Sequence, residues 1–515
     1  MAFPDGTEHL LTCAEMGRAD RHAIDGGVPG ATLMAAAGAA VATAIRRRYR
    51  PRPVLVLAGP GNNGGDGWVV VRDLADHGWD VRVAALGDPA ALKGDAAWAR
   101  TLWTGPVESA RPEALDGAGL VVDALFGAGL ARDLDGVAAD TVAGLAARVA
   151  AGTTLSVAVD VPSGVDGDTG RVRGVAAPAD LTVTFFRRKP GHLLMPGRAL
   201  CGSVRVADIG IPASALDAIA PAATVDAPAL WRDAVGGRRT SDHKYRRGHV
   251  VVVGGPMSGA ARLALAAARR SGVGLATAAV PPGAVALFAG DAPGAIVREV
   301  DGADGLARLL GDPRYSAVVV GPGLGGPDFG GNGARGLVEA ALAAGRPVLL
   351  DADGLNAFAG AAEDLARQIS AATVLTPHEG EFKRLFPDID PAALGKLAAA
   401  RAAASAVGAT VLLKGADSVI AAPDGRAAIA ENAPPTLATA GSGDVLAGLI
   451  GGLLARGVPA FEAAAAGAWI HGEAGRAAGV SVLAEDIVGH IGPVVERRSP
   501  VPRNLLFRGL FGDGG

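Results

Sequence analysis

The stretch RPVLVLAGPGNNGGDGWVVVRDLADHGWDVRVAAL, residues 52–86, predicts the fold of the first half of the chain. It reads as a short apolar strand, a glycine-rich turn, a helix and a second strand. Apolar runs without alternation are typical of strands buried on both faces of a parallel sheet. Two more such runs, at 117–129 and 154–170, include an acidic residue where the strand ends. The first half is therefore expected to be an α/β domain.

A second strand–helix series begins at residue 248 with GHVVVVGG and ends in helices after TLATAGSGDVLAG. The alternation again predicts α/β structure. Near 211–240 the pattern lapses into Pro, Ala and a charge cluster, which indicates a linker. The expected organisation is two domains and a tail: residues 1–217, 224–498 and 499–515.

Composition limits the possible partners. Lysine and arginine number 48 against 52 acidic residues, a net charge of −4, which argues against a nucleic-acid-binding surface. The longest apolar run, 445–455, is about half of what a membrane span needs. The N-terminus does not read as a signal peptide. Cys13 and Cys201 form no disulfide framework. We expect a cytoplasmic protein, possibly a homo-oligomer, that acts on small molecules rather than on nucleic acid or membranes.

Two loops, Gly59–Gly64 and Gly321–Gly326, match the G-x-G-x-x-G pattern of dinucleotide-binding folds. The pattern is weak in a chain with 76 glycines. Neither loop has a clear acid at the end of the next strand to hold a ribose. No Walker A sequence is present. A dehydrogenase is therefore one hypothesis among several.

Polar residues gather where the first-half strands end. Asn62, Asn63 and Asp66 are expected in a loop at the carboxyl edge of the sheet, where such folds bind ligands. Three more oxygen-bearing residues lie at strand ends in the same half: Asp123, Asp160 and Ser163. Carboxylates facing one crevice are costly unless their charge is compensated, and a cation would compensate it. A turn that merely tolerates Asn and Gly is the alternative.

The motifs together resemble a known family. GPGNNGGDG, DALFGAGL, VDVPSGVDGDTG and TFFRRKPGHLLMPG resemble the NAD(P)H-hydrate epimerase domain, a Rossmann-like fold. KYRRGHVVVVGG, GPGLGG, LLDADGLNAF, TPHEGEF, LKGADSVIAAPDG and ATAGSGDVLAG resemble the ADP-dependent NAD(P)H-hydrate dehydratase, a ribokinase-like fold. The matches follow the family order over about residues 8–498. Ala128 stands where Thr is common, and Glu379 where Pro is common.

The resemblance implies two reactions on NADH or NADPH hydrated at C6 of the nicotinamide ring. The first domain would interconvert the R and S hydrates with bound K⁺. The second would dehydrate the S hydrate at the expense of ADP, with Mg²⁺, releasing AMP and phosphate. Phosphorylation would turn the poor hydroxide leaving group into a good one.

The resemblance also implies roles for individual residues. Asp160 would be the acid/base of the first domain, with Lys189 as a second candidate, and K⁺ would be bound by Asn63, Asp123 and Ser163. The implied substrate contacts are Asn62, Asn63, Gly64, Gly65, Asp66, Gly127, Ala128, Gly129, Leu130, Asp160, Ala260, Gly323, His378 and Asp444. The implied nucleotide contacts are Lys414, Gly415, Ala416, Asp417, Ser418 and Gly443.

Asp444 is expected to be the base of the second domain. In GSGD, the glycines allow the backbone to approach phosphate oxygens, and N–H groups at a helix N-terminus bind anions. Asp444 would then lie within reach of the substrate hydroxyl. Alternatively, it caps the helix. A ribokinase-like small-molecule kinase and a non-catalytic nucleotide-binding scaffold remain competing hypotheses.

Overall fold

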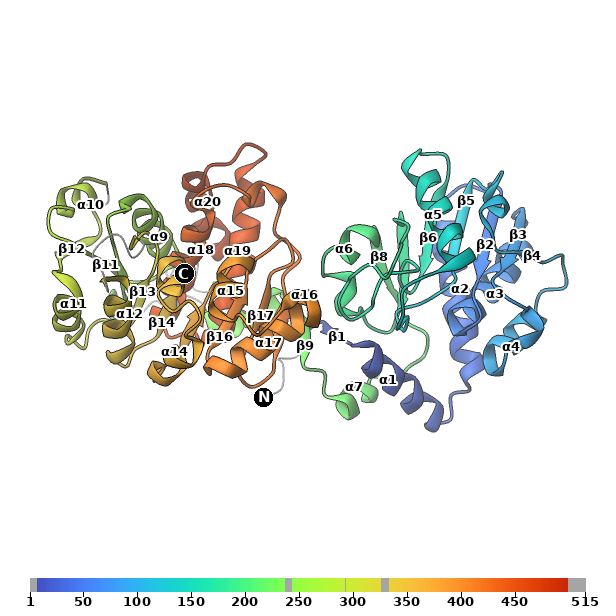
Figure 1. Ribbon diagram of the computed structural model, residues 1–515, viewed down its shortest axis with the longest axis horizontal. Coiled ribbons are helices and arrows are strands. Elements are labelled where there is room, and N and C mark those ends of the chain that lie inside the picture. The colour runs from blue at the N-terminus through green and yellow to red at the C-terminus, as the bar shows by residue number, and fades with distance from the viewer. Residues whose placement is uncertain (1–6, 237–242, 292, 326–332, 499–515) are drawn as a thin grey trace, which may run out of the picture. The chain divides into compact units, whose positions relative to one another are not determined.

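The computed structural model describes residues 7–236, 243–291, 293–325 and 333–498, so the expected tail at 499–515 lies outside the described residues. The chain divides into two compact units: residues 9–223, and residues 1–8 together with 224–515. Each unit is an α/β structure built on one mainly parallel sheet (Figure 1). The α/β class predicted for both halves is confirmed.

The first unit has a parallel sheet in the order β4-β3-β2-β5-β6-β7-β8. The strands are β2 (Val54–Ala58), β3 (Val81–Ala85), β4 (Glu108–Ser109), β5 (Leu120–Ala124), β6 (Leu155–Val159), β7 (Leu181–Phe185) and β8 (Ser203–Ala207). The chain runs from β2 toward one edge and returns to β5 to run toward the other. The strand order therefore reverses between β2 and β5, where α/β sheets bind ligands.

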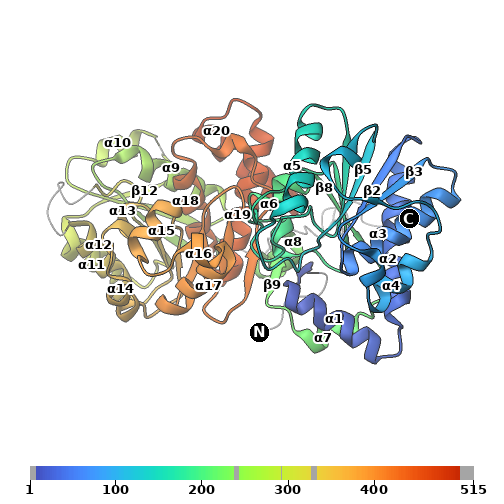
Figure 2. The ribbon, with the colours of Figure 1, turned by 45° about the vertical axis from the view of Figure 1, so that its right-hand side comes forward.

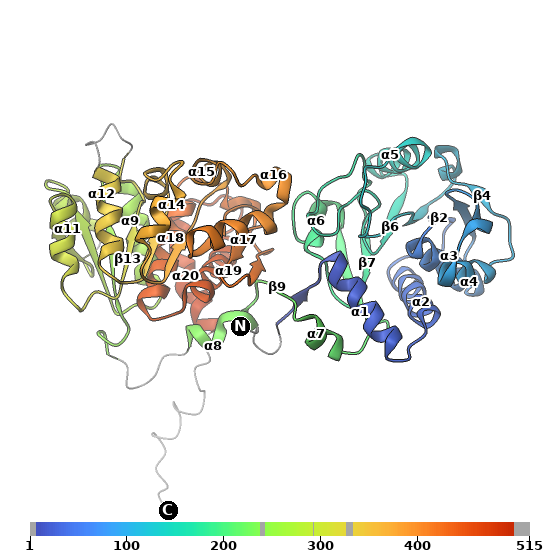
Figure 3. The same cartoon turned by 60° about the horizontal axis from the view of Figure 1, so that its bottom comes forward.

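Helices cover both faces of this sheet. Val54 and Val56 pack toward α1 (Cys13–Asp25), α2 (Gly30–Arg48) and α3 (Asn62–Asp76), whereas Leu55 and Leu57 pack toward α5 (Gly136–Ala150). Figure 3 shows α5 on one side of the strands, with α2, α3 and α4 (Gly94–Thr101) on the other. Burial on both faces explains the continuous apolar runs of the sequence.

The second unit has a larger sheet that includes the order β9-β18-β17-β16-β15-β14-β13-β10-β11-β12. The strands are β9 (Ala223–Val225), β10 (His249–Val253), β11 (Leu275–Val280), β12 (Ile296–Glu299), β13 (Ala317–Val320), β14 (Val348–Leu350), β15 (Thr373–Leu375), β16 (Thr410–Leu413), β17 (Val419–Ala421) and β18 (Ala427–Ile429). Strands β10 to β16 are parallel, and β17 pairs antiparallel with both neighbours. The strand order here reverses between β10 and β13.

Helices α9 (Ser258–Arg270), α18 (Ser442–Ala455), α19 (Ala460–Ala478) and α20 (Ala484–Arg498) supply the core against one face of this sheet. Figure 2 shows α18 beside α9. Glycine makes this close packing possible, because a Cβ at Gly448 would lie 1.9 Å from the carbonyl oxygen of Ala264. The remaining helices of this unit are α10 (Val285–Asp291), α11 (Gly302–Leu310), α12 (Gly333–Ala343), α13 (Asp353–Asn356), α14 (Ala362–Gln368), α15 (Glu379–Leu385), α16 (Pro391–Leu394) and α17 (Lys396–Val407).

The segment expected to be a linker is more structured than its composition indicates. It contains α7 (Ser214–Ile219), β9 and α8 (Pro228–Val235). Leu230 and Trp231 of α8 are buried in the core of the second unit. The boundary between the two units, between residues 223 and 224, falls within the segment 211–240 in which a linker was expected.

Candidate functional site

A cavity of about 780 Å³ opens at the strand-order reversal of the first unit. Its walls come from α1, α2, the start of α3, the turn after β5 and the ends of β6 and β7. The predicted residues that line it are Asn62, Asn63, Asp66, Gly127, Ala128, Gly129, Leu130, Asp160 and Lys189. Most of the residues predicted for the first site thus share one cavity.

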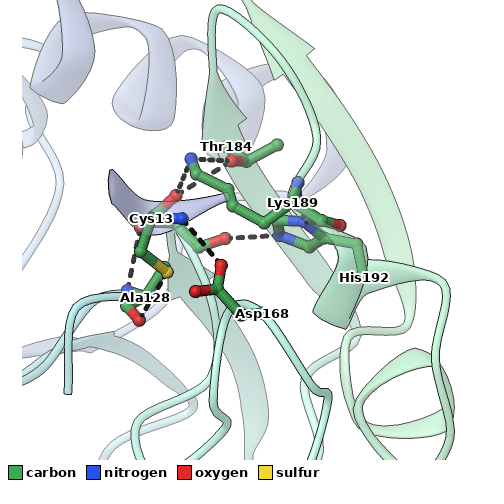
Figure 4. A network of polar contacts seen from close by, with 7 residues as sticks. Cys13, Ala128, Asp168, Thr184, Lys189 and His192 are labelled. Atoms are coloured by element: carbon green, nitrogen blue, oxygen red, sulfur yellow. Dashed lines mark hydrogen bonds and ion pairs between the residues drawn. The ribbon is translucent and has the colours of Figure 1, made fainter. Parts of the chain in front are cut away.

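The carboxylate of Asp160 accepts hydrogen bonds from neighbouring groups at the wall of this cavity. The Lys189 Nζ atom donates to Asp160 Oδ1 over 2.5 Å and to Thr184 Oγ1 over 2.9 Å. The Ala128 N–H donates to Asp160 Oδ2 over 3.0 Å (Figure 4). Asp160 has φ 67°, a left-handed conformation that is uncommon for a residue other than glycine. Such a conformation persists where surrounding contacts hold it. At Asp160 it places the carboxylate at the cavity wall.

The environment keeps Asp160 ionised. Burial alone would raise the pKa of Asp160, but the charge and hydrogen bond of Lys189 lower it to about 2. Lys189 is itself only 2% exposed, so the two form a buried ion pair. Asp160 can therefore accept a proton near neutral pH, and another group would have to donate one.

His192 was missed by the sequence analysis, although it stands within the quoted TFFRRKPGHLLMPG motif. The Lys189 N–H donates to His192 Nδ1 over 2.9 Å, and His192 Nε2 lies 2.8 Å from the Asp160 carbonyl oxygen. Burial lowers the pKa of His192 to about 4, so the ring is neutral and its Nε2–H is the donor to that carbonyl. His192 thus fixes the backbone on both sides of the ion pair.

The segment NNGGDG is helical rather than a loop, which corrects the sequence-based expectation. Asn62 begins α3, so Asn62, Asn63 and Asp66 lie in its first two turns. Gly64 and Gly65 serve packing, because a Cβ at Gly64 would lie 1.9 Å from the carbonyl oxygen of Gly59. Glycines that allow a helix to pack closely against the preceding strand cannot be told from loop glycines by sequence alone.

Asp123 and Ser163 are joined behind the cavity wall. Ser163 donates to Asp123 twice, from Oγ over 2.5 Å and from N over 2.8 Å. Asp123 is 1% exposed, and burial raises its pKa. In the described ranges no basic side chain pairs with it. Asn63, the third predicted ligand, lies by the turn after β5, because a Cβ on Gly127 would be 3.0 Å from Asn63 Oδ1.

In the second unit, carboxylates from different elements surround Lys414. The Lys414 Nζ atom lies 2.8 Å from Asp351 Oδ1 and 3.8 Å from Glu381 Oε2. Asp351 follows β14, Glu381 lies on α15 and Lys414 follows β16. All three residues lie at the carboxyl side of parallel strands. Asp351 and Glu381 were not among the predicted site residues, although both occur in motifs quoted for the resemblance.

Asp444 lies in the first turn of α18, beyond Gly441, which takes φ 84° as the N-cap. Burial raises the pKa of Asp444 to about 6, and so do Asp351, Asp353 and Glu381, while Lys414 opposes them. No side chain caps this helix. The carboxyl group is thus free of a capping bond, and a Cβ on Gly443 would lie 3.5 Å from Lys414 Nζ. The lysine therefore lies beside the first turn of the helix.

The other predicted residues of this unit take several positions. Gly323 meets Ala260, with a Cβ on Gly323 3.1 Å from the Ala260 Cβ, at the strand-order reversal. His378 caps α15, since its Nδ1 accepts from the Gly380 and Glu381 N–H groups. Asp417 pairs with Lys396 over 2.5 Å, and the Ser418 hydroxyl donates to the Gly415 carbonyl over 2.8 Å. The structure thus brings Ala260 and Gly323 together.

Within the described ranges, no group of three or more His, Cys, Asp or Glu side chains is arranged to hold a metal ion. The described helices also include none that is both long and apolar enough to cross a membrane.

Two family models match the chain. The one described as YjeF-related protein N-terminus matches residues 30–191, and the one described as NAD(P)H-hydrate dehydratase matches residues 250–489. The chain is 37% identical to a Synechocystis protein named bifunctional NAD(P)H-hydrate repair enzyme Nnr, over 90% of each chain. A Salinibacter ruber protein of the same name is 38% identical over 95% of this chain and 96% of its own.

Among solved structures, the Bacillus subtilis ADP/ATP-dependent NAD(P)H-hydrate dehydratase, co-crystallised with ATP and Mg²⁺, is similar to part of the chain. It is 26% identical, and the match covers 53% of this chain and 98% of that one with a TM-score of 0.47.

Proposed function

Because the chain belongs to the family of bifunctional NAD(P)H-hydrate repair enzymes, we propose that its two sites carry out the two steps that restore a hydrated nicotinamide cofactor. The first unit interconverts the R and S hydrates of NADH and NADPH. The second dehydrates the S hydrate at the expense of ADP, giving AMP and phosphate. The assigned ranges are residues 1–217 and 224–498.

In the first unit, the ionised Asp160 is the base that takes a proton at the C6 carbinolamine. The observation that carries this assignment is its buried pair with Lys189 at the wall of a cavity of about 780 Å³. Lys189 keeps Asp160 deprotonated and is not itself the base, because an ammonium that donates two hydrogen bonds has no lone pair to offer. The wall residues Asn62, Asn63, Asp66 and Gly127 to Leu130 bind the substrate, with Gly64 and Gly65 between them in α3.

The residues behind the cavity fit a potassium ion. Asp123, Ser163 and Asn63 offer hard oxygen donors without sulfur or imidazole. Asp123 is buried without a compensating cation among the described side chains, which favours a bound one. When bound, K⁺ would neutralise Asp123 and hold the turn after β5. Asp123→Asn should therefore reduce epimerisation at low K⁺ and be partly rescued by high K⁺; equal rates in K⁺-free buffer for the variant and the parent protein would contradict the site.

In the second unit, Asp444 takes the proton of the C6 hydroxyl as that oxygen attacks the terminal phosphorus of ADP. The N–H groups at Gly441–Gly443 hold phosphate oxygens. Lys414 lies beside them and supplies positive charge. The segment Lys414–Ser418 binds the adenylate, and Gly323, Ala260 and His378 bind the hydrate. Three carboxylates around one lysine leave excess negative charge, which fits a Mg²⁺ ion that binds together with ADP.

The test is incubation of the purified protein with chemically made hydrate and ADP, following the absorbance of the reduced nicotinamide. Pure S hydrate should be converted with ADP present and not without it. Pure R hydrate should be converted by the whole chain faster than it epimerises spontaneously. A kinase would instead release a stable phosphorylated product without restoring the absorbance. We also propose a cytoplasmic location. Light scattering on the purified protein tests whether it forms a homo-oligomer.

A further inference from the structure

Asp66 is a buried carboxyl group that the described contacts leave without a partner. It is 9% exposed and lines the cavity of the first unit together with Asp160. None of the described residues donates a hydrogen bond to it or forms an ion pair with it. A buried polar group without a partner costs free energy unless a ligand or water satisfies it. A carboxyl group in that state at a cavity wall points to the molecule that fills the cavity.

A second unsatisfied group lies one helical turn before it. The Asn63 Nδ2 atom is buried and has no acceptor, and Asn63 also lines the cavity. The space beside it is open because residue 127 is glycine: a Cβ there would lie 3.0 Å from Asn63 Oδ1 and 3.1 Å from Asp160 Oδ2. Asn63, Asp66 and Asp160 thus face one space in which polar groups of a substrate have partners.

The pKa values of the two acids in this space are shifted in opposite directions. Burial raises the pKa of Asp66 well above its usual value, the charges of Asp160 and Asp20 add to this, and Lys189 opposes it. Asp160, by contrast, has a pKa of about 2 because Lys189 is bonded to it. Asp95 on α4 also lines the cavity. Paired acids whose environments separate their pKa values are suited to opposite roles, one donating a proton and the other accepting one.

We propose that Asp66 is the proton donor of the epimerisation, acting opposite the proton acceptor Asp160. This inference rests on the proposed epimerase function. The Asp66 carboxylic acid protonates the C6 hydroxyl, the C6–O bond breaks, and water leaves with the bonding pair while the N1 lone pair forms N1=C6. A water molecule then adds to the other face of C6, its lone pair forming the new C6–O bond and the N1=C6 π pair returning to N1. Asp160 takes the proton of that water and returns it to Asp66 through cavity water.

This assignment explains why the Asp160–Lys189 pair does not suffice alone. Hydroxide is a poor leaving group, so the step that removes it needs a proton from a positioned general acid. Asp160 is ionised and Lys189 already donates to Asp160 and Thr184. Asp20, Asp66 and Asp95 also line the cavity, and of these three acids only Asp66 is buried.

The test compares Asp66→Asn with Asp76→Asn in the full chain. Asp76 lies on the same helix, outside the cavity, and pairs with Arg72. Asparagine keeps the size of Asp66 without its acidic proton, so melting temperature should not fall. We expect Asp66→Asn to lower kcat for R hydrate by about 10²–10⁴-fold with KM changed little, Asp66→Glu to recover part of it, and Asp76→Asn to match the parent protein. In H₂¹⁸O, the parent protein should place label at the C6 hydroxyl faster than the enzyme-free control.

Three results would overturn the assignment: unchanged kcat in Asp66→Asn, a loss confined to KM, or epimerisation by the parent protein without ¹⁸O incorporation. The first two leave the epimerase function intact, with Asp66 as a bystander or a binding residue. The third indicates ring opening at the N1–C6 bond. If the parent protein does not epimerise R hydrate at all, the proposed function fails instead.

Discussion

Asp160 and Asp444 hold comparable positions in the two units but differ in pKa. Each follows or faces the carboxyl side of parallel strands, and each has one lysine nearby. Lys189 is bonded to Asp160 and lowers its pKa to about 2. Burial and nearby carboxylates raise the pKa of Asp444 to about 6, and Lys414, which pairs with Asp351 and lies near Glu381, opposes this only in part. A lysine bonded directly to the acid therefore keeps its pKa low, whereas a lysine shared with other carboxylates does not offset the effect of burial.

This difference matches the two proposed reactions. The epimerase base meets a carbinolamine and must remain ionised inside a cavity. The dehydratase base must take a proton from a hydroxyl while a phosphoryl group arrives, and a base is most effective with a pKa near the working pH. The additional carboxylates in the second unit also supply negative charge for a divalent cation that binds together with ADP.

The largest expected effect is that of Asp444→Asn. The substitution removes the base and leaves the N–H groups of Gly441–Gly443 intact. Dehydration of the S hydrate should fall by about 10²–10⁴-fold, whereas ADP affinity, melting temperature and epimerisation should stay close to those of the parent protein. Rates, calorimetric ADP binding and thermal melting on this one variant are the measurements. Retention of the dehydration rate would show that Asp444 only occupies the helix start.

Next in size is the loss of the buried lysine. Lys189→Met leaves Asp160 without its cation, which typically costs about 3–5 kcal/mol for a buried pair. Epimerisation should collapse and the first unit should melt earlier. The double variant Lys189→Met/Asp160→Asn should recover much of the stability and none of the activity. Denaturant unfolding of both variants tests this, and equal stability of the single and double variants would contradict a buried ion pair.

A smaller effect should appear in the pH profiles. Asp444 acts in its ionised form, so dehydration should fall as pH drops through about 6. The loss should be roughly tenfold between about pH 7 and about pH 5. Asp160 stays ionised down to about pH 2, so epimerisation should not fall over the same interval. Initial rates on separate R and S hydrates measure both pH profiles. If both rates fell equally at acid pH, the predicted difference in pKa between the two bases would be contradicted.

The smallest effect is expected from separating the units. Residues 1–217 should epimerise and residues 224–515 should dehydrate only the S hydrate, since each unit has its own core. The second fragment loses Glu8, whose carbonyl accepts from the Val225 N–H over 2.9 Å, so its melting temperature should drop slightly. Activity assays on the two purified fragments decide this. Two insoluble or inactive fragments would mean that the units depend on each other.

The sequence by itself determined the two α/β halves, the buried parallel strands and nine of the 27 residues that line the first cavity. Those features follow from local apolar runs and from acids placed where strands end, such as Asp160 after β6. The helical start of α3 at Asn62 escaped prediction, because glycines that permit close helix–strand packing look the same in sequence as glycines of a loop.

Only the tertiary structure decided the chemistry of the acids. Asp66 and Asp160 are 94 positions apart in sequence yet line one cavity, and nothing in their neighbours along the chain explains why their pKa values shift in opposite directions. The separation comes from Lys189, which reaches Asp160 and not Asp66, and from burial. Likewise Lys414, Asp351 and Glu381 meet only because β14, β15 and β16 end side by side. A pKa depends on charges and solvent in three dimensions, and a sequence does not list those distances.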